Sequence, residues 1–277
     1  MRQRTIKNNV TLRGKGLQTG AEVTLTFKAA PANSGINFIR VDLPNKPLLN
    51  IQSLDLGGSD APERRTTVGT GALQVQTTEH LLAALAALSI DNIVIEADNV
   101  ELPGLDGSSK PFLEALKKAS LAEQDADRKV LSVKDVVWAS QNDAMISVFP
   151  DDEFKVSYLL SYDNPAIGTH YFSIVVNEES FEREIAPART FCLEEEAQEL
   201  LRRGLGKGAD YNNTLVIGKT GPLHTACRFP DEPVRHKILD LIGDLYLLGL
   251  PLKGHVVAIK SGHALNMELV KKLKRLV

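Results

Sequence analysis

The chain has 277 residues, of which 43% are hydrophobic, so it can bury a substantial core in one large domain or two moderate ones. Its formal net charge of -3 and a sequence pI near 6.1 give no broad positive field of the kind that holds a protein on nucleic acid or anionic lipid. We therefore expect no nucleic-acid partner and no stable membrane insertion, and we favour two domains.

Cysteine content and the apolar segments indicate a soluble cytoplasmic protein. The two cysteines, Cys192 and Cys227, are too few for a disulfide framework. Residues 1–10 lack the apolar core of a secretory signal. The most apolar helical run, residues 238–252, contains two aspartates and is shorter than the roughly 20 residues that span a bilayer.

The first half of the chain predicts strands and helices in alternation. β-forming residues at 23–27 and 36–40, on either side of a Pro- and Gly-containing turn, predict a hairpin. Thr77 or Thr78 is expected to cap a helix from Glu79 to about Leu88, and Ser108 or Ser109 a second helix that begins near Pro111. A strand at 92–96 is expected between these helices.

A polar segment, residues 121–129, has little to bury and predicts a linker, so we divide the chain into domains at 1–126 and 127–277. The second half then predicts an antiparallel sheet followed by helices. Its expected strands lie at 133–138, 145–149, 154–160, 171–176 and 255–259, and its expected helices at 193–203, 233–248 and around Leu269.

The two halves repeat one pattern, since His80 and His236 each open a helix that is followed by a β-rich run, a loop and another helix. The spacing between the matched landmarks is nearly constant. This pattern suggests an ancient duplication.

Three polar residues, His236, Asp240 and Asp244, lie four apart in an otherwise apolar helix and so share one face. Buried without partners they would cost several kcal/mol, so either a cation or a structural ion pair is expected to satisfy them. Composition alone predicts about one His-x-x-x-acid pair by chance, so this spacing does not choose between the two.

Two further positions are candidates for catalysis. Glu79 stands beside His80, an arrangement in which one side chain binds a metal and its neighbour acts as a general base, although an acidic residue also suits the first turn of any helix. His263 lies in a Gly-containing turn after a strand, where functional residues often gather but ordinary histidines also occur.

Five segments stand out when the sequence is taken as a whole: residues 78–85, 101–108, 188–191, 234–240 and 261–266. Together they closely resemble the UDP-3-O-acyl-N-acetylglucosamine deacetylase family, the zinc amidases that commit bacterial cells to lipid A synthesis. The resemblance covers essentially the whole chain, in order.

The resemblance implies a fold of the α+β class: two similar domains, each a sheet layered with helices, whose helices face each other across a cleft. It implies that His80, His236 and Asp240 bind Zn²⁺ and that Glu79 accepts the proton of the attacking water. The implied substrate is an acylated UDP-N-acetylglucosamine, and we expect a monomer.

The same resemblance implies roles for residues around the metal. Thr190 and Lys237 would stabilise the oxyanion, and His263 would stabilise the intermediate or protonate the departing amine, oriented by Asp244. Phe191 would pack against the sugar, and apolar residues flanking 185–216 would form a passage for the acyl chain.

Two positions depart from the family pattern, which usually has histidine at Gln18 and an acidic residue near Asn212.

Two other functions remain as alternatives. An iron oxygenase also uses two histidines and one carboxylate, usually placed on strands, and a sugar-nucleotide-binding module could keep the fold without catalysis.

Overall fold

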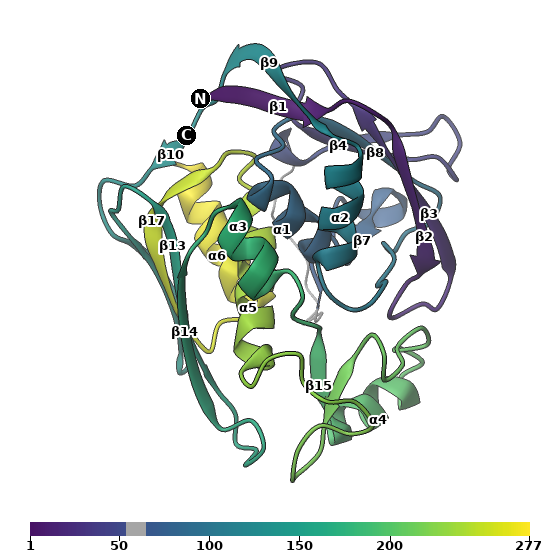
Figure 1. Cartoon of the computed structure of the whole chain (residues 1–277), viewed down its shortest axis with the longest axis vertical. Coiled ribbons are helices and arrows are strands. Elements are labelled where there is room, and N and C mark those ends of the chain that lie inside the picture. The colour runs from purple at the N-terminus through teal and green to yellow at the C-terminus, as the bar shows by residue number, and fades with distance from the viewer. Residues whose placement is uncertain (54–64) are drawn as a thin grey trace.

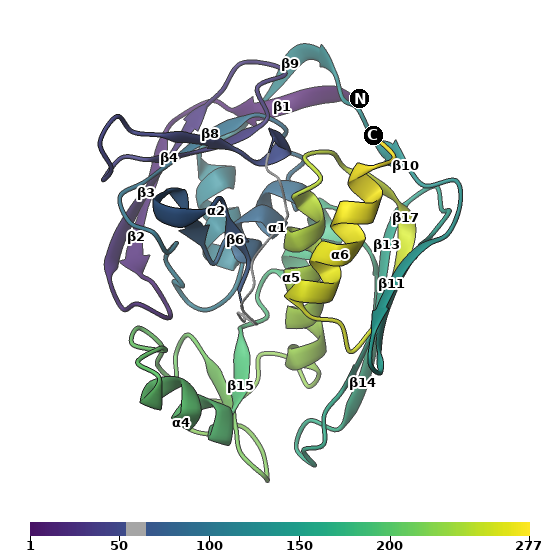
Figure 2. The same cartoon turned by 180° about the vertical axis from the view of Figure 1, so that it is seen from behind.

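Two β-sheets form the outer layers of the protein, and helices fill the space between them (Figures 1 and 2). The computed structural model describes residues 1–53 and 65–277. Helices α1 (Glu79–Ala87) and α2 (Lys110–Lys118) line the sheet of the first half, while α5 (Glu232–Tyr246) and α6 (His263–Lys274) line that of the second. The α+β class and the facing helices are confirmed.

The first-half sheet has the strand order β2-β3-β8-β4-β5. Its strands are β2 (Val10–Lys15), β3 (Glu22–Ala29), β8 (Ile93–Ala97), β4 (Ile36–Arg40) and β5 (Leu48–Asn50). The expected hairpin of β3 with β4 is wrong, because β8 lies between them, antiparallel to β3 and parallel to β4. The buried side chains of Ile93, Ile95 and Ala97 suit β8 to this central position. The turn sequence between β3 and β4 gave no sign that another strand would come between them.

The second-half sheet repeats this order as β11-β12-β17-β13-β14, with β10 beside β17. Its strands are β10 (Leu131–Ser132), β11 (Val137–Gln141), β12 (Ala144–Phe149), β17 (Leu252–Ile259), β13 (Phe154–Ser161) and β14 (Thr169–Val175). Central β17 is antiparallel to β12 but parallel to β13, so the expectation of a purely antiparallel sheet is wrong. The matching strand orders support the duplication.

Two segments of the predicted layout differ from the structure. The strand expected at 133–138 is replaced by β10 and β11 with an irregular stretch between them. The polar segment expected as a linker is largely a strand, β9 (Leu121–Asp127), which pairs antiparallel with β1 (Arg2–Ile6). Backbone pairing requires no apolar side chains, which explains how so polar a segment forms a strand. The domain boundary that we propose falls at the end of β9.

A small module projects from the second half below the facing helices (Figure 1). It comprises β15 (Phe191–Leu193), α4 (Glu194–Arg202) and β16 (Leu215–Ile217), with β15 and β16 parallel. We call residues 191–217 the α4 module. The remaining short elements are η1 (Ile51–Ser53), β6 (Thr67–Val68), η2 (Gly71–Leu73), β7 (Val75–Gln76), α3 (Glu178–Ser180) and η3 (Phe181–Ile185).

The residues expected to cap α1 and α2 have other partners. Thr78 and Ser109 occupy the N-cap positions, but neither side chain makes a cap hydrogen bond. The Thr78 hydroxyl donates to the carbonyl of Thr66 at 3.3 Å, and that of Ser109 to the carbonyl of His80 at 2.7 Å. The Thr78 hydroxyl therefore connects the start of α1 to the segment at Thr66, and the Ser109 hydroxyl connects the start of α2 to α1. No helix in the described ranges is both long and apolar enough to span a membrane.

Candidate metal centre and active site

Helices α1 and α5 approach unusually closely because α5 carries a glycine at their contact. A Cβ atom on Gly243 would lie 2.1 Å from the carbonyl oxygen of Glu79. Any larger residue would therefore push the helices apart. This contact joins the two halves of the chain at the first turn of α1, where Glu79 and His80 lie.

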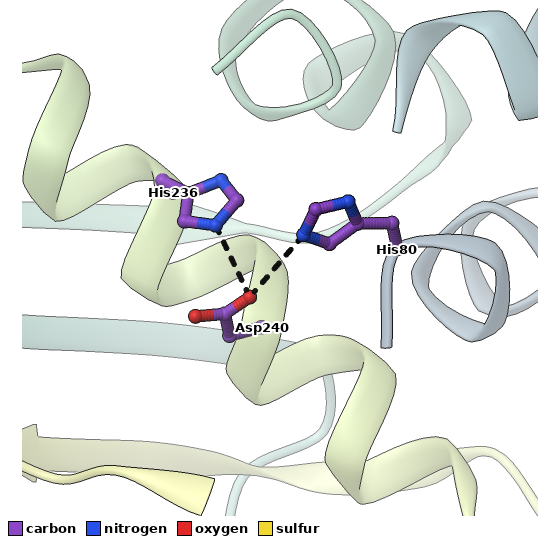
Figure 3. Close-up of side chains that lie close together, drawn as sticks. All are labelled: His80, His236 and Asp240. Carbon is purple, nitrogen blue, oxygen red and sulfur yellow. Dashed lines mark ion pairs between the residues drawn. The ribbon is translucent and has the colours of Figure 1, made fainter. Parts of the chain in front are cut away.

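His80, His236 and Asp240 converge between these helices (Figure 3). His80 Nε2 lies 3.8 Å from Asp240 Oδ1, and His236 Nε2 lies 3.3 Å from the same oxygen. The imidazole centroids are 5.0 Å apart and the rings are nearly perpendicular. One potential ligand atom from each residue lies within 4.8 Å of the other two, so all three atoms can reach a single cation.

The protonation states of this triad suit a divalent cation. Burial lowers the pKa of His80 to about 3 and also lowers the pKa of His236, so both imidazoles are neutral. Burial alone would raise the pKa of Asp240, but nearby Lys237 and the histidines lower it, so the carboxylate is ionised. Two neutral imidazoles and one carboxylate form a ligand set that zinc accepts.

Hydrogen bonding fixes one of the two imidazoles. His236 Nδ1 lies 3.0 Å from the carbonyl oxygen of Ala188, which can hold the proton on that nitrogen and leave Nε2 free to bind a metal. His80 Nδ1 is buried and has no hydrogen-bond partner within residues 1–53 and 65–277. The three residues therefore form a donor set that fits a metal. Within the described residues, the Nδ1 atom of His80 lacks the hydrogen-bond partner that Nδ1 of His236 has.

Glu79 lies beside the triad as a buried carboxylate. Its Oε2 accepts a hydrogen bond from the backbone N–H of Thr66 at 3.0 Å. Burial raises the pKa of Glu79 to about 7, while the charge of His263 acts in the opposite direction. Glu79, Asp240 and His263 also bring ligand atoms within 4.8 Å of one another, which places Glu79 and His263 around the same centre.

His263 is held by a buried aspartate. Its Nδ1 lies 2.8 Å from Asp244 Oδ2, and Asn266 Nδ2 donates to the same oxygen at 2.8 Å. The hydroxyl of Thr66 donates to Asp244 Oδ1. Burial alone would lower the pKa of His263, but the carboxylate of Asp244 raises it to about 9, so the imidazole is a cation at neutral pH.

Lys237 is paired with the candidate metal ligand. Its Nζ donates to Asp240 Oδ2 at 2.8 Å, on the opposite carboxylate oxygen from the one that faces the two histidines. Burial alone would lower the pKa of Lys237, but Asp240 raises it, so the ammonium is retained.

A cavity of about 710 Å³ opens from this centre into the α4 module. His236, Lys237, Asp240 and His263 line one end, together with Thr190. The ring centroid of Phe191 lies 6.4 Å from that of His236. The rest of the lining is mixed. It includes apolar residues, among them Cys192, Ala197, Leu200, Leu201, Val216 and Leu223, and polar ones, among them Gln18, Glu194, Gln198 and Asp210.

The structure also places the two departures from the family pattern. Gln18 lines the cavity, and its Oε1 accepts a hydrogen bond from the N–H of Gly206 at 3.1 Å. Asn212 is exposed in the turn after Asp210, whose Oδ1 accepts from its backbone N–H. Of the two departures, Gln18 is therefore part of the cavity wall, whereas Asn212 is not among the residues that line the cavity.

Sequence reasoning missed the contacts of two residues of the site, although one of them, Ala188, lies in a segment that resembles the family. Thr66 contacts both Glu79 and Asp244, and the carbonyl of Ala188 orients His236. Neither has a spacing or composition signal, because both act through contacts between distant segments. The apolar surroundings of His236 and Asp240 were the one local signal of a buried polar site.

Comparison with known proteins identifies the family. A profile of the UDP-3-O-acyl N-acetylglycosamine deacetylase family matches residues 3–275. A UDP-3-O-acyl-N-acetylglucosamine deacetylase from Anaeromyxobacter sp. (strain Fw109-5) is 41% identical over 273 residues, covering 98% of this chain and 88% of the relative. One of the same name from Chlamydia abortus is 41% identical over 275 residues, covering 98% of this chain and 96% of the relative.

A longer relative, the bifunctional enzyme LpxC/FabZ of Chlorobaculum tepidum, is 39% identical over 305 residues. That match covers 99% of this chain but 64% of the relative, so the chain spans less than two thirds of that protein. The family profile and the whole-chain relatives agree with the resemblance seen in the sequence. This chain belongs to the UDP-3-O-acyl N-acetylglycosamine deacetylase family.

Proposed function

We propose that this protein hydrolyses the acetamide of UDP-3-O-acyl-N-acetylglucosamine, releasing acetate and the free amine, and that it uses zinc to do so. The observation that carries the proposal is the convergence of His80 from one half with His236 and Asp240 from the other. The names of the relatives support the substrate.

His80, His236 and Asp240 would hold the zinc ion. An ion with an open coordination position lowers the pKa of water to about 7 and polarises a carbonyl group. The three side chains already have the protonation states that metal binding requires, because both imidazoles are neutral and the carboxylate is ionised.

Glu79 is the proposed general base. It would take a proton from water as the water attacks the acetamide carbonyl, and a base works best when its pKa is near the operating pH. Burial brings the pKa of Glu79 to about 7, and the Thr66 N–H holds one carboxylate oxygen.

Two donors are proposed to stabilise the tetrahedral oxyanion. The Thr190 hydroxyl and the Lys237 ammonium line the same end of the cavity as His236. One preorganised donor of this kind is worth about 10²- to 10³-fold in rate.

His263 is the proposed cation that either stabilises the intermediate or donates the proton to the departing amine; in the first case Glu79 would carry out both proton transfers. The Asp244 contact at 2.8 Å fixes the ring and keeps it protonated at neutral pH. Asp244 acts through His263 and is therefore a positioning residue.

The cavity suits an amphiphilic substrate. Phe191 would pack against the sugar near the reaction centre, and the apolar interior of the α4 module would take the acyl chain. The aliphatic side chains of Ala197, Leu200, Leu201, Val216 and Leu223 in the cavity lining support this assignment, and the polar residues among them leave room for the polar parts of the substrate.

The decisive experiment measures acetate release from acylated UDP-N-acetylglucosamine, with and without a chelator, together with metal content. Glu79→Ala should keep zinc and lose nearly all turnover, whereas His236→Ala should lose the metal. Near-normal turnover of Glu79→Ala would refute the base. Iron dependence with oxygen consumption and no acetate release would instead establish the oxygenase, and sugar-nucleotide binding without turnover the non-catalytic module.

A further inference from the structure

A buried glutamate outside the reaction centre lies at the junction of the two halves that enclose the cavity. Glu101 is 1% exposed, and its carboxylate accepts hydrogen bonds from a turn of the first half, residues 16–20. The backbone N–H of Gln18 donates to Oε1 at 2.8 Å and that of Thr19 to Oε2 at 2.8 Å. The Thr19 hydroxyl adds a third bond, to Oε2 at 2.6 Å.

No basic side chain in the described part of the protein forms an ion pair with Glu101. A fourth donor, the hydroxyl of Thr77, lies 3.2 Å from Oε1. Bonds between a carboxylate and N–H or O–H donors are stronger and shorter than neutral ones. Glu101 therefore fixes the backbone of the 16–20 turn through neutral donors alone.

The turn at residues 16–20 also contacts and holds the α4 module. Backbone N–H groups of Lys207 and Gly208 donate to the carbonyls of Gln18 and Leu17, at 3.2 and 3.1 Å. The Gly206 N–H donates to the Gln18 side chain at 3.1 Å. A Cβ atom on Gly208 would lie 2.2 Å from the carbonyl oxygen of Gly16, so the two backbones pack without room for a side chain.

The loop that follows Glu101 contacts both ends of the same module. Gly107 accepts a hydrogen bond from the N–H of Thr190, just before β15, at 2.8 Å. A Cβ atom on Gly107 would lie 1.6 Å from the carbonyl oxygen of Asn213, just before β16. Glu101 and its loop thus hold the module at its base, while the 16–20 turn holds the far side.

These contacts enclose the cavity between surfaces from both halves of the chain. Leu17 and Gln18 line it from the first half, and Leu200, Leu201 and Gly206 from the α4 module. Glu101 bonds to the first of these surfaces at Gln18 and Thr19 but does not line the cavity itself.

We propose that Glu101 is a positioning residue that determines acyl-chain selectivity by holding the 16–20 turn, and through it the α4 module, at a fixed distance. This inference rests on the proposed function for the identity of the chain, but not for the contacts themselves. Glu101→Gln keeps the shape and replaces one acceptor oxygen with an NH₂ group that faces N–H and O–H donors. The turn should then loosen.

The first test measures hydrogen exchange of the metal-loaded protein. In Glu101→Gln the amides of residues 18–19 and 206–208 should exchange faster, whereas those of α5 should not change. Thr19→Val, which removes one bond to Glu101 at a residue that does not line the cavity, should give a smaller effect of the same kind. Glu22→Gln, an exposed glutamate paired with Lys15, is the matched control and should behave as wild type.

The second test measures kcat/KM for UDP-N-acetylglucosamine carrying 3-O-acyl chains of graded length. In Glu101→Gln and Thr19→Val, kcat/KM for the chain length that the wild type prefers should fall about tenfold or more, while kcat/KM for the poorest chain length changes little, so the length profile flattens. A uniform loss at every length, or unchanged exchange at residues 206–208 in both variants, would overturn the proposal. If the wild-type protein releases no acetate, the proposed function is refuted. The hydrogen-exchange result would then still show whether Glu101 holds the turn and the α4 module.

Discussion

Replacing Gly243 with alanine should separate the helices that carry the candidate metal ligands. The added Cβ would lie 2.1 Å from the Glu79 carbonyl oxygen and 2.9 Å from the Glu79 Cα. Since ordinary carbon–oxygen contacts begin at about 3.3 Å, α1 and α5 must separate by about 1 Å.

The expected effect on activity is larger than that on stability. Overpacking costs about 1–3 kcal/mol, and alanine recovers about 1 kcal/mol through its higher helix propensity, so the free energy of unfolding should fall by up to about 2 kcal/mol. A displacement of about 1 Å at a reaction centre can cost about 10²-fold in rate, so kcat/KM should fall by that order.

Acetate release, zinc content and chemical denaturation would measure these effects. Gly262→Ala is the control for stability, because nothing lies within 4 Å of its added Cβ and its φ of -135° suits any residue. A Gly243→Ala protein with wild-type activity and stability would refute the argument that this glycine brings the two halves into register.

Three further outcomes are expected. Activity should fall as the pH rises through about 9, because His263 loses the proton that Asp244 holds there, and Asp244→Asn should move this fall to lower pH; an unmoved profile would contradict the pairing. Glu232→Gln, which breaks a buried ion pair with Arg189 at 3.0 Å, should cost about 3 kcal/mol in urea unfolding, whereas Glu199→Gln at an exposed pair should cost little; equal effects would refute the role of burial. Removing the metal should lower the melting temperature, since a ligand bound to the folded state alone stabilises it, and a chelator without effect would argue against a bound ion.

The sequence predicted the helices of the site better than the pairing of its strands. The helical spacing of His236 and Asp240 within an apolar run places them on one face, and the structure confirms it. The position of β8 between β3 and β4 depends on long-range pairing, for which no local turn signal exists. The polar β9 was missed because its backbone bonds to β1 leave no apolar pattern.

The convergence of His80 with His236 and Asp240 was inferred from family resemblance, not from spacing. Physically it depends on Gly243, whose lack of a side chain allows α1 and α5 to touch. A glycine inside a helix indicates close approach but does not name the partner. The contacts of Thr66 were equally unpredictable from the sequence. Its N–H reaches Glu79 within the first half without any repeating spacing, and its hydroxyl reaches Asp244 only when the two halves are packed together.

The repeated strand order has a consequence for how the two halves diverged. Their frames match, yet the chemistry is unequal: four residues after His236 stands Asp240, whereas four residues after His80 stands the buried Ala84. The first half supplies Glu79, the proposed base, and one candidate ligand, whereas the second supplies two candidate ligands and the lysine that pairs with one of them. We therefore expect that neither half could replace the other and that losing either would abolish the proposed centre.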